Sequence, residues 1–186
     1  MSSDFNFKIT TPLSGKLGTV SLDLGSGSRP RNPFDASTIW GIDIEVSNLE
    51  NIITADLVMQ PIPFADQSVD FVTAFDFIEH IPRLIYSPDR RYPFVALMNE
   101  ISRVLRPEGY FLSVTPYFPR PSAFVDPTHV NFITPNTWKY FDIQYNWAKM
   151  YGYCGSLEMI QNSEGNEHLE LYLEGFSLFF VLIILL

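Results

Sequence analysis

The chain has 186 residues, of which 46% are hydrophobic and 18% are charged, and its formal net charge is −9. These values fit one folded domain, 1–186, with a sizeable core, and they exclude both a disordered chain and two ordinary domains. A nucleic-acid-binding protein normally carries a basic face that neutralises phosphates, so the acidic balance predicts no nucleic-acid partner.

The cysteine content and the two ends of the chain bear on where the protein is located. A single cysteine, Cys154, excludes an intrachain disulfide and a thiol-rich metal site, which favours the cytoplasm. Residues 1–10 lack the basic start and the apolar run of a secretory signal. Residues 176–186 are apolar except for Ser177, but a membrane-spanning helix needs roughly 20 residues. We therefore expect no transmembrane segment, and this apolar tail is a homo-oligomer contact, a membrane-surface contact or a buried last strand.

Short apolar runs in the first half of the chain predict four strands. They cover residues 19–24, 38–44, 52–57 and 69–75. The first run leads directly into a glycine turn, and acidic residues lie near the ends of the second and third. Such a series of strands is typical of an open sheet with a ligand crevice at its carboxyl edge.

The spacing of apolar residues predicts a helix over residues 92–105. One stripe of this helix carries the side chains of Val95, Met98, Ile101 and Leu105. Pro107 and Gly109 should end it, because proline cannot continue a helix and glycine suits a turn. A fifth strand is expected at 110–115.

Two further features follow the fifth strand. The proline-rich residues 116–135 are too broken for regular structure and long enough for a functional loop. A short helix over 135–141 is expected to follow, with Thr134 as its N-cap.

The last predicted elements are two strands, 156–161 and 168–173, joined in a hairpin by residues 162–166. Because strands and helical segments alternate along the chain, the sequence predicts an α/β fold. We expect a Rossmann-like three-layer sandwich with a mostly parallel seven-stranded sheet and this C-terminal antiparallel hairpin.

The first chemical motif is Asp23-Leu24-Gly25-Ser26-Gly27, at the end of the first strand. Small residues there let a ligand approach the backbone closely. Asp43 ends the second strand, where a carboxylate can accept both hydroxyls of a ribose, and Asp56 ends the third. Because the carboxyl ends of parallel strands share one edge of a sheet, these three acids should converge on a nucleoside ligand.

The connection after this turn distinguishes between nucleoside cofactors. A dinucleotide-binding motif has a third glycine and a helix whose N-terminus holds a pyrophosphate. Here Pro30 stands at that glycine position and Pro33 follows, so a long regular helix cannot form. S-adenosylmethionine (SAM) has no phosphate, so the sequence favours SAM and disfavours an NAD-dependent oxidoreductase.

Several segments together resemble the class I SAM-dependent methyltransferases of the type 11 group. These segments are LDLGSGSRP (22–30), GIDI (41–44), ADL with PIPFADQSVDFV (55–72), AFDFIEHI (74–81) and EISRVLRPEGYFLSVTP (100–116). The resemblance covers roughly residues 19–141. The chain departs from the group at Arg29, where a third glycine is frequent, and in lacking the usual first helix.

The resemblance implies roles for the predicted cofactor residues. Asp23 with Gly25, Ser26 and Gly27 would hold the methionine end of SAM. Asp43, with Ile44 beside it, would hold the ribose, and Asp56 with Leu57 the adenine. Phe75 and Asp76, at the end of the fourth strand, would close over the cofactor.

Two histidines are candidates for the chemistry on the acceptor. His129, in Asp126-Pro127-Thr128-His129, can act as a general base, because a histidine near its reference pKa accepts protons at neutral pH. Asp126 would orient it, or cap a helix. The other reading is that His129 only pins its loop. His80, in Glu79-His80, can take a proton too, or the pair simply packs beside the sheet.

The aromatic residues of the same region could form the wall of an acceptor pocket or belong to the core. They are Tyr117, Phe118, Phe124, Phe132, Trp138, Tyr140 and Phe141. No zinc-type spacing is present, so no metal site is expected. The resemblance thus implies a methyltransferase that acts on a small-molecule or sugar acceptor, with the 116–135 loop covering the acceptor. The alternative is a non-catalytic protein that binds SAM or a nucleoside and acts through a partner.

Overall fold

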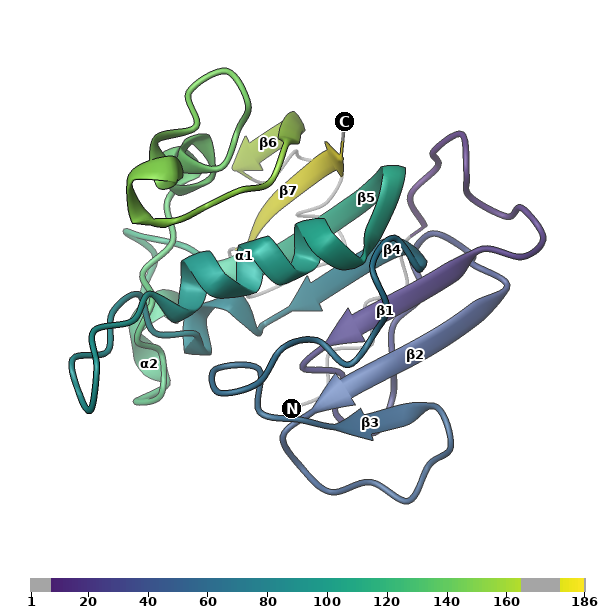
Figure 1. Ribbon diagram of the computed structural model, residues 1–186, viewed down its shortest axis with the longest axis horizontal. Helices are drawn as coiled ribbons and strands as arrows, with labels where there is room; N and C mark the ends of the chain where they lie inside the picture. Colours follow the sequence, from purple (N-terminus) through teal and green to yellow (C-terminus); the bar gives the residue numbers. More distant parts are fainter. Residues whose placement is uncertain (1–7, 165–177, 186) are drawn as a thin grey trace.

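The computed structural model describes residues 8–164 and 178–185. Its centre is a seven-stranded sheet with the strand order β3-β2-β1-β4-β5-β7-β6 (Figure 1). The strands are β1 (Val20–Leu24), β2 (Thr38–Asp43), β3 (Ile52–Thr54), β4 (Val69–Phe75), β5 (Leu105–Pro116), β6 (Leu157–Glu164) and β7 (Leu178–Leu185). The helices are α1 (Pro93–Val104), α2 (Ser122–Val125) and the 3₁₀ helices η1 (Ile78–His80), η2 (Pro135–Tyr140) and η3 (Trp147–Tyr151).

The first five strands are parallel, as the sequence predicts. β1 pairs with β2 on one side and with β4 on the other, so its residues are covered by neighbours at both edges. All seven residues of β4 are buried, and this explains its continuous apolar and small sequence VDFVTAF. The carboxyl ends of β1 to β4 therefore meet at one edge of the sheet.

Helix α1 covers one face of the sheet. Its stripe of Leu97, Met98 and Ile101 is buried against Leu22 of β1 and Phe111 of β5, among others in one cluster. Figure 1 shows the helix crossing in front of β4 and β5. The predicted amphipathic helix is confirmed within one residue at each end.

The opposite face has no such helix in the part of the chain that the structure describes. Phe71 of β4 and Tyr110 of β5 pack there against Phe34, whose ring is stacked on Phe71 at 4.4 Å between centroids. Ile9 and Leu13 pack on the same cluster. The expectation of three layers is wrong for this region, because irregular segments cover the second face.

The turn predicted at residues 106–109 is present inside β5. Leu105 pairs with Val69, but the next pair joins Tyr110 to Phe71, so the residues between them loop out. Glu108 has a φ of 65°, which is the left-handed conformation of a tight turn. The regular part of β5 therefore begins where the fifth strand was expected.

The C-terminal strands differ from the predicted hairpin. The first predicted strand corresponds to β6, but residues 168–173 lie outside the described residues. The antiparallel partner of β6 is β7, which also pairs antiparallel with β5. Residues 178–185 of the apolar tail thus form an interior strand of the sheet, with its backbone paired on both sides, so an oligomer contact through a free strand has no support in the described residues. Within the described ranges, no helix is long and apolar enough to cross a membrane.

Candidate functional site

The glycine turn after β1 is held against β2. The N–H groups of Gly25 and Ser26 both donate to the carbonyl of Ile42, at 2.8 and 3.1 Å. Gly25 and Gly27 have φ values of 67° and 56°, which glycine adopts without a steric cost. The connection from this turn to β2 contains no helix. The backbone therefore forms a tight exposed turn at the carboxyl edge of the sheet, as predicted.

Asp23 lies beneath this turn and is completely buried. Its carboxylate accepts hydrogen bonds from the Thr73 hydroxyl (2.6 Å) and from the N–H of Arg31 (2.8 Å). Burial raises the pKa of Asp23 to about 6, against these hydrogen bonds, which lower it. Asp23 thus connects the turn to β4 by hydrogen bonds. Because its side chain is completely buried, it can act on a ligand only indirectly, by positioning the turn.

Asp43 is partly exposed beside the turn. Its carboxylate accepts from the N–H of Gly27 at 2.8 Å and from the N–H of Glu45 at 2.9 Å. Ile44, next to it, is 67% exposed. Unlike Asp23, Asp43 has carboxylate surface that a ligand hydroxyl can reach.

The remaining predicted cofactor residues follow β3, which ends at Thr54 and not at Asp56 as expected, or lie at the end of β4. Asp56 is partly exposed and accepts from the N–H of Val58 at 2.9 Å, while Leu57 is buried. The Phe75 side chain is also buried, under the guanidinium of Arg31 at 4.7 Å from the ring centroid. Phe75 therefore offers a ligand only its backbone. Asp76 follows it in the left-handed conformation, with φ of 49° and an exposed side chain.

The structure brings the three candidate catalytic residues together. The rings of His80 and His129 are edge to face, with centroids 4.9 Å apart. The Thr128 hydroxyl donates to Asp126 at 2.6 Å and lies 3.0 Å from Nδ1 of His80. Partial burial and the neighbouring His129 lower the pKa of His80 below its ordinary value, because both disfavour the charged ring.

Glu79 joins this cluster and was not predicted as a site residue. It is 1% exposed, and one carboxyl oxygen accepts from the buried Thr115 hydroxyl at 2.7 Å. Burial raises the pKa of Glu79 to about 8. The signal available in the sequence was its position before His80, but burial of the side chain could not be read from that pair.

The loop over 116–135 is anchored to the same cluster. The N–H groups of Val130 and Asn131 both donate to the carbonyl of Glu79 at 2.9 Å. The Asn131 side chain accepts from Nε of Arg83 at 2.5 Å, and Arg83 also donates to the carbonyl of Phe132 at 2.6 Å. These bonds fix the loop that carries His129 next to η1.

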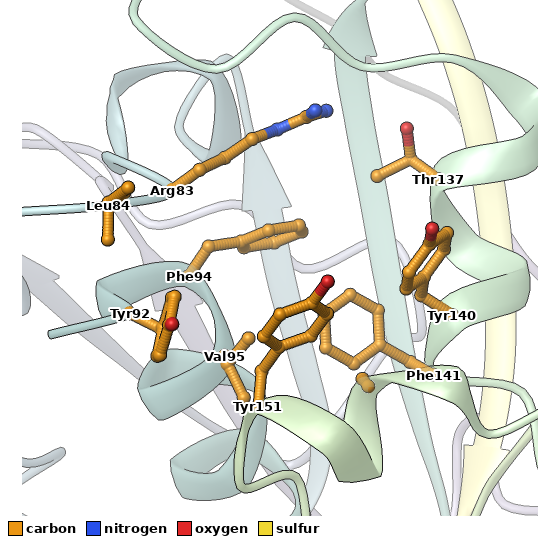
Figure 2. A pocket seen from close by; sticks show the side chains of 10 residues that line it. Arg83, Leu84, Tyr92, Phe94, Val95, Thr137, Tyr140, Phe141 and Tyr151 are labelled. Carbon is orange, nitrogen blue, oxygen red and sulfur yellow. The ribbon is translucent and has the colours of Figure 1, made fainter.

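Arg83 also lies at the rim of a cavity of about 330 Å³. Figure 2 shows aromatic rings around this space, and the guanidinium of Arg83 on the side of Thr137. The rings are those of Tyr92, Phe94, Tyr140, Phe141 and Tyr151. Of the aromatic residues considered from the sequence, Tyr140 and Phe141 line this cavity, while Tyr117 and Trp138 belong to the core.

Comparison with known proteins agrees with this geometry. A family model described as a methyltransferase domain, of type 11, matches residues 22–113. No curated protein matches the sequence.

Three solved structures illustrate the shared fold. A SAM-dependent methyltransferase from Aquifex aeolicus has a TM-score of 0.54 and 14% identity, over 91% of this chain and 83% of that one. A chain from the Haloferax volcanii complex that contains the Trm112 methyltransferase activator has a TM-score of 0.57 and 13% identity, with 90% and 83% covered. The phosphoethanolamine N-methyltransferase 1 of Haemonchus contortus, solved with phosphoethanolamine and S-adenosylhomocysteine, has a TM-score of 0.57 and 13% identity, with 89% and 38% covered.

The residues at the carboxyl edge fit the SAM cofactor of this family. No helix follows the turn that could hold a phosphate, and SAM carries no phosphate. Asp43 presents a partly exposed carboxylate that accepts a hydrogen bond from the turn itself, at Gly27. The site therefore combines a backbone cradle with an acceptor for hydroxyl groups.

Proposed function

Because the chain belongs to the type 11 family of SAM-dependent methyltransferases, we propose that it transfers a methyl group from SAM to a small-molecule or sugar acceptor. The observation that carries the proposal is the glycine turn fastened to Asp43 at the carboxyl edge of a parallel sheet. Binding sites of open α/β sheets lie at this edge.

In this proposal, residues at the carboxyl ends of β1 to β4 would hold the cofactor. The turn of Gly25, Ser26 and Gly27 holds its methionine end, positioned from below by Asp23. Asp43 and Ile44 contact the ribose. Asp56 and Leu57 meet the adenine, and the backbone of Phe75 with Asp76 closes the site.

The acceptor enters on the side of the 116–135 loop. The cavity beside Arg83 has the aromatic lining and the few polar groups that suit a small organic molecule or a sugar ring. It is connected to the histidine cluster through the bond from Arg83 to Asn131, whose N–H is bound to Glu79.

SAM supplies an activated methyl group, and the chain's own residues position the acceptor and manage its proton. His129 donates through Nδ1 to the carbonyl of Ala123 at 3.2 Å, so its Nε2 keeps a free lone pair. We assign to His129, with His80 and Asp126 beside it, the activation of an acceptor hydroxyl. An amine acceptor would need only to be held in its unprotonated form.

Two features of the composition bear on the proposed location of the enzyme and on its partners. The free thiol of Cys154 is exposed and suits a reducing compartment, so the proposal locates the activity in the cytoplasm. The net charge of −9 remains the reason to expect no nucleic-acid partner.

The decisive experiment is calorimetry of SAM binding to Asp43→Ala. Loss of the ribose contact and of the anchor at Gly27 should weaken binding by about 30-fold or more, since each hydrogen bond to a charged group contributes about 1.5–3 kcal/mol. Glu45→Ala is the matched control, because this neighbouring acid is exposed and only its backbone bonds to Asp43. Equal affinities in the two variants would refute the ribose assignment.

A methyl-release assay on candidate acceptors tests the catalytic part. His129→Ala should lower turnover by about 10²-fold or more while SAM affinity stays within about threefold. An unchanged rate would remove His129 from the acceptor site. SAM binding without transfer to any acceptor would favour the alternative, a binding protein that acts through a partner.

A further inference from the structure

Three potential metal ligands meet at the acceptor side of the site, although the sequence shows no metal-binding spacing. Glu79, His80 and His129 each offer one ligand atom, and these atoms all lie within 4.8 Å of one another. Two ligands from η1 and one from the 116–135 loop form the group, so only the tertiary structure assembles it.

The ring of His129 is held in the form that a metal ligand needs. A carbonyl oxygen can only accept, so the contact of 3.2 Å between Nδ1 and the carbonyl of Ala123 puts the proton on Nδ1. The Nε2 atom is then the nitrogen with a free lone pair. Metal-binding histidines almost always have such a bond from the second nitrogen to a carbonyl or a carboxylate.

The ring of His80 is held in the same form by a longer chain of hydrogen bonds. The Thr128 hydroxyl gives its single proton to the carboxylate of Asp126 at 2.6 Å. Its oxygen therefore accepts the proton of His80 Nδ1 at 3.0 Å, and Nε2 of His80 is free as well. Both histidines thus have the second-nitrogen partner that orients metal ligands.

The third ligand has an oxygen without a partner. Glu79 is buried, and its Oε2 is held by the Thr115 hydroxyl, whereas Oε1 makes no hydrogen bond and is shielded from solvent. A buried carboxyl oxygen with no hydrogen-bond partner is uncommon in a folded protein, and a bound ion is one of the recognised explanations. This observation is independent of the two histidine tautomers.

We propose that Glu79, His80 and His129 bind one divalent transition-metal ion, with Zn²⁺ as the type of ion they suit. Two imidazoles and one carboxylate favour such an ion over Mg²⁺, which prefers oxygen ligands. With metal–ligand bonds of about 2.1 Å, the ligand atoms around a tetrahedral ion lie about 3.4 Å apart. The three ligand atoms now lie within 4.8 Å of one another, so the side chains need to move only a short distance toward one another to bind the ion. The partly exposed rings of His80 and His129 can make this movement.

Three protein ligands leave a fourth coordination position for water or for an oxygen of the acceptor. This role rests on the proposed function, but binding of the ion does not. In the metal-bound protein His129 acts on the acceptor through the ion instead of taking the proton itself. The ion would favour an acceptor with a hydroxyl group over an amine.

The test is calorimetry of Zn²⁺ binding to chelator-treated protein. Wild type should bind one ion per chain, and His80→Gln, His129→Gln and Glu79→Gln should each lose about tenfold or more in affinity. Cys154→Ser is the control and should bind as wild type does, because this thiol is exposed and is not one of the three proposed ligands. Wild-type affinity in His129→Gln, loss of binding in the control, no binding by the wild type, or equal affinity for Mg²⁺ would each overturn the proposal.

Two further measurements separate this proposal from misfolding and from the proposed function. Co²⁺ in the same site should give visible bands without thiolate charge transfer, and thermal unfolding should show each variant folded. Because the Glu79 side chain is buried, His129→Gln carries the conclusion if Glu79→Gln fails to fold.

Asp43→Ala should lose SAM binding and keep Zn²⁺ binding, while His129→Gln should lose Zn²⁺ binding and keep SAM binding. Loss of both ligands in His129→Gln would contradict a separate metal site.

Discussion

Replacement of Asp23 by asparagine tests the electrostatics beneath the glycine turn. The carboxyl is completely buried and its pKa is raised to about 6, whereas an unfolded chain holds it at the ordinary value of 3.8. Between these values the folded protein keeps a proton that the unfolded chain has released. The stabilisation is therefore present at low pH and is lost as the pH rises through about 6.

The size of the effect follows from the two pKa values. Going from about pH 4.5 to about pH 8, this single group should lower the free energy of unfolding of the wild type by about 2 kcal/mol. Asparagine has the same shape and no ionisable proton. Its oxygen can accept from the Arg31 N–H, and its amide can donate to the Thr73 hydroxyl, so both partners are retained.

The assay is urea unfolding of both proteins at the two pH values. The wild type should lose about 2 kcal/mol more than Asp23→Asn on going to the higher pH. Asp35→Asn is the control, because Asp35 is exposed and its pair with Lys8 contributes little. If the wild type and Asp23→Asn changed in parallel with pH, burial of Asp23 would not be what perturbs this carboxyl.

Three other variants probe the scaffold of the site. Gly25→Ala should weaken SAM binding by about tenfold, because φ is 67° and the new Cβ would lie 2.6 Å from the Phe77 ring; unaltered affinity in calorimetry would show that the turn adapts. Arg103→Met should lower the free energy of unfolding in urea by about 2–3 kcal/mol, since it removes the ion pair of 2.6 Å to Glu100 and hydrogen bonds to two carbonyls. A loss below about 0.5 kcal/mol would show that solvent screens these contacts. Trp138→Ala should cost about 3–5 kcal/mol, because the ring is fully buried, and a small loss would mean that its neighbours collapse into the space.

Local sequence patterns were sufficient to predict the parallel part of the sheet, β1 to β5. An apolar run of the right length, a glycine turn and an acid at the next strand end are all features of a few adjacent residues. The bounds of β4 and the extent of α1 were accordingly predicted almost to the residue. The turn at 25–27 and its neighbour Asp43 were expected at one edge because parallel strands put their carboxyl ends together.

The pairing of the last strands could not be predicted in the same way. Residues 168–173 and 178–185 both have apolar content, and sequence alone does not say which one pairs with β6. The structure pairs 178–185 with both β5 and β6. Strand pairing is a contact between distant segments, so it depends on which edges of the sheet remain open and not on the strand's own residues.

The sequence by itself therefore determined the cofactor end of this protein: a glycine turn without a helix, followed by acids at successive strand ends. Only the tertiary structure decided which of these acids are exposed, since Asp23 is buried and Asp43 is not. It also decided that Glu79 and His80 meet His129 across a long stretch of chain. The physical reason is that backbone conformation is encoded largely by neighbouring residues, whereas burial and the meeting of distant side chains arise only when the whole chain is packed.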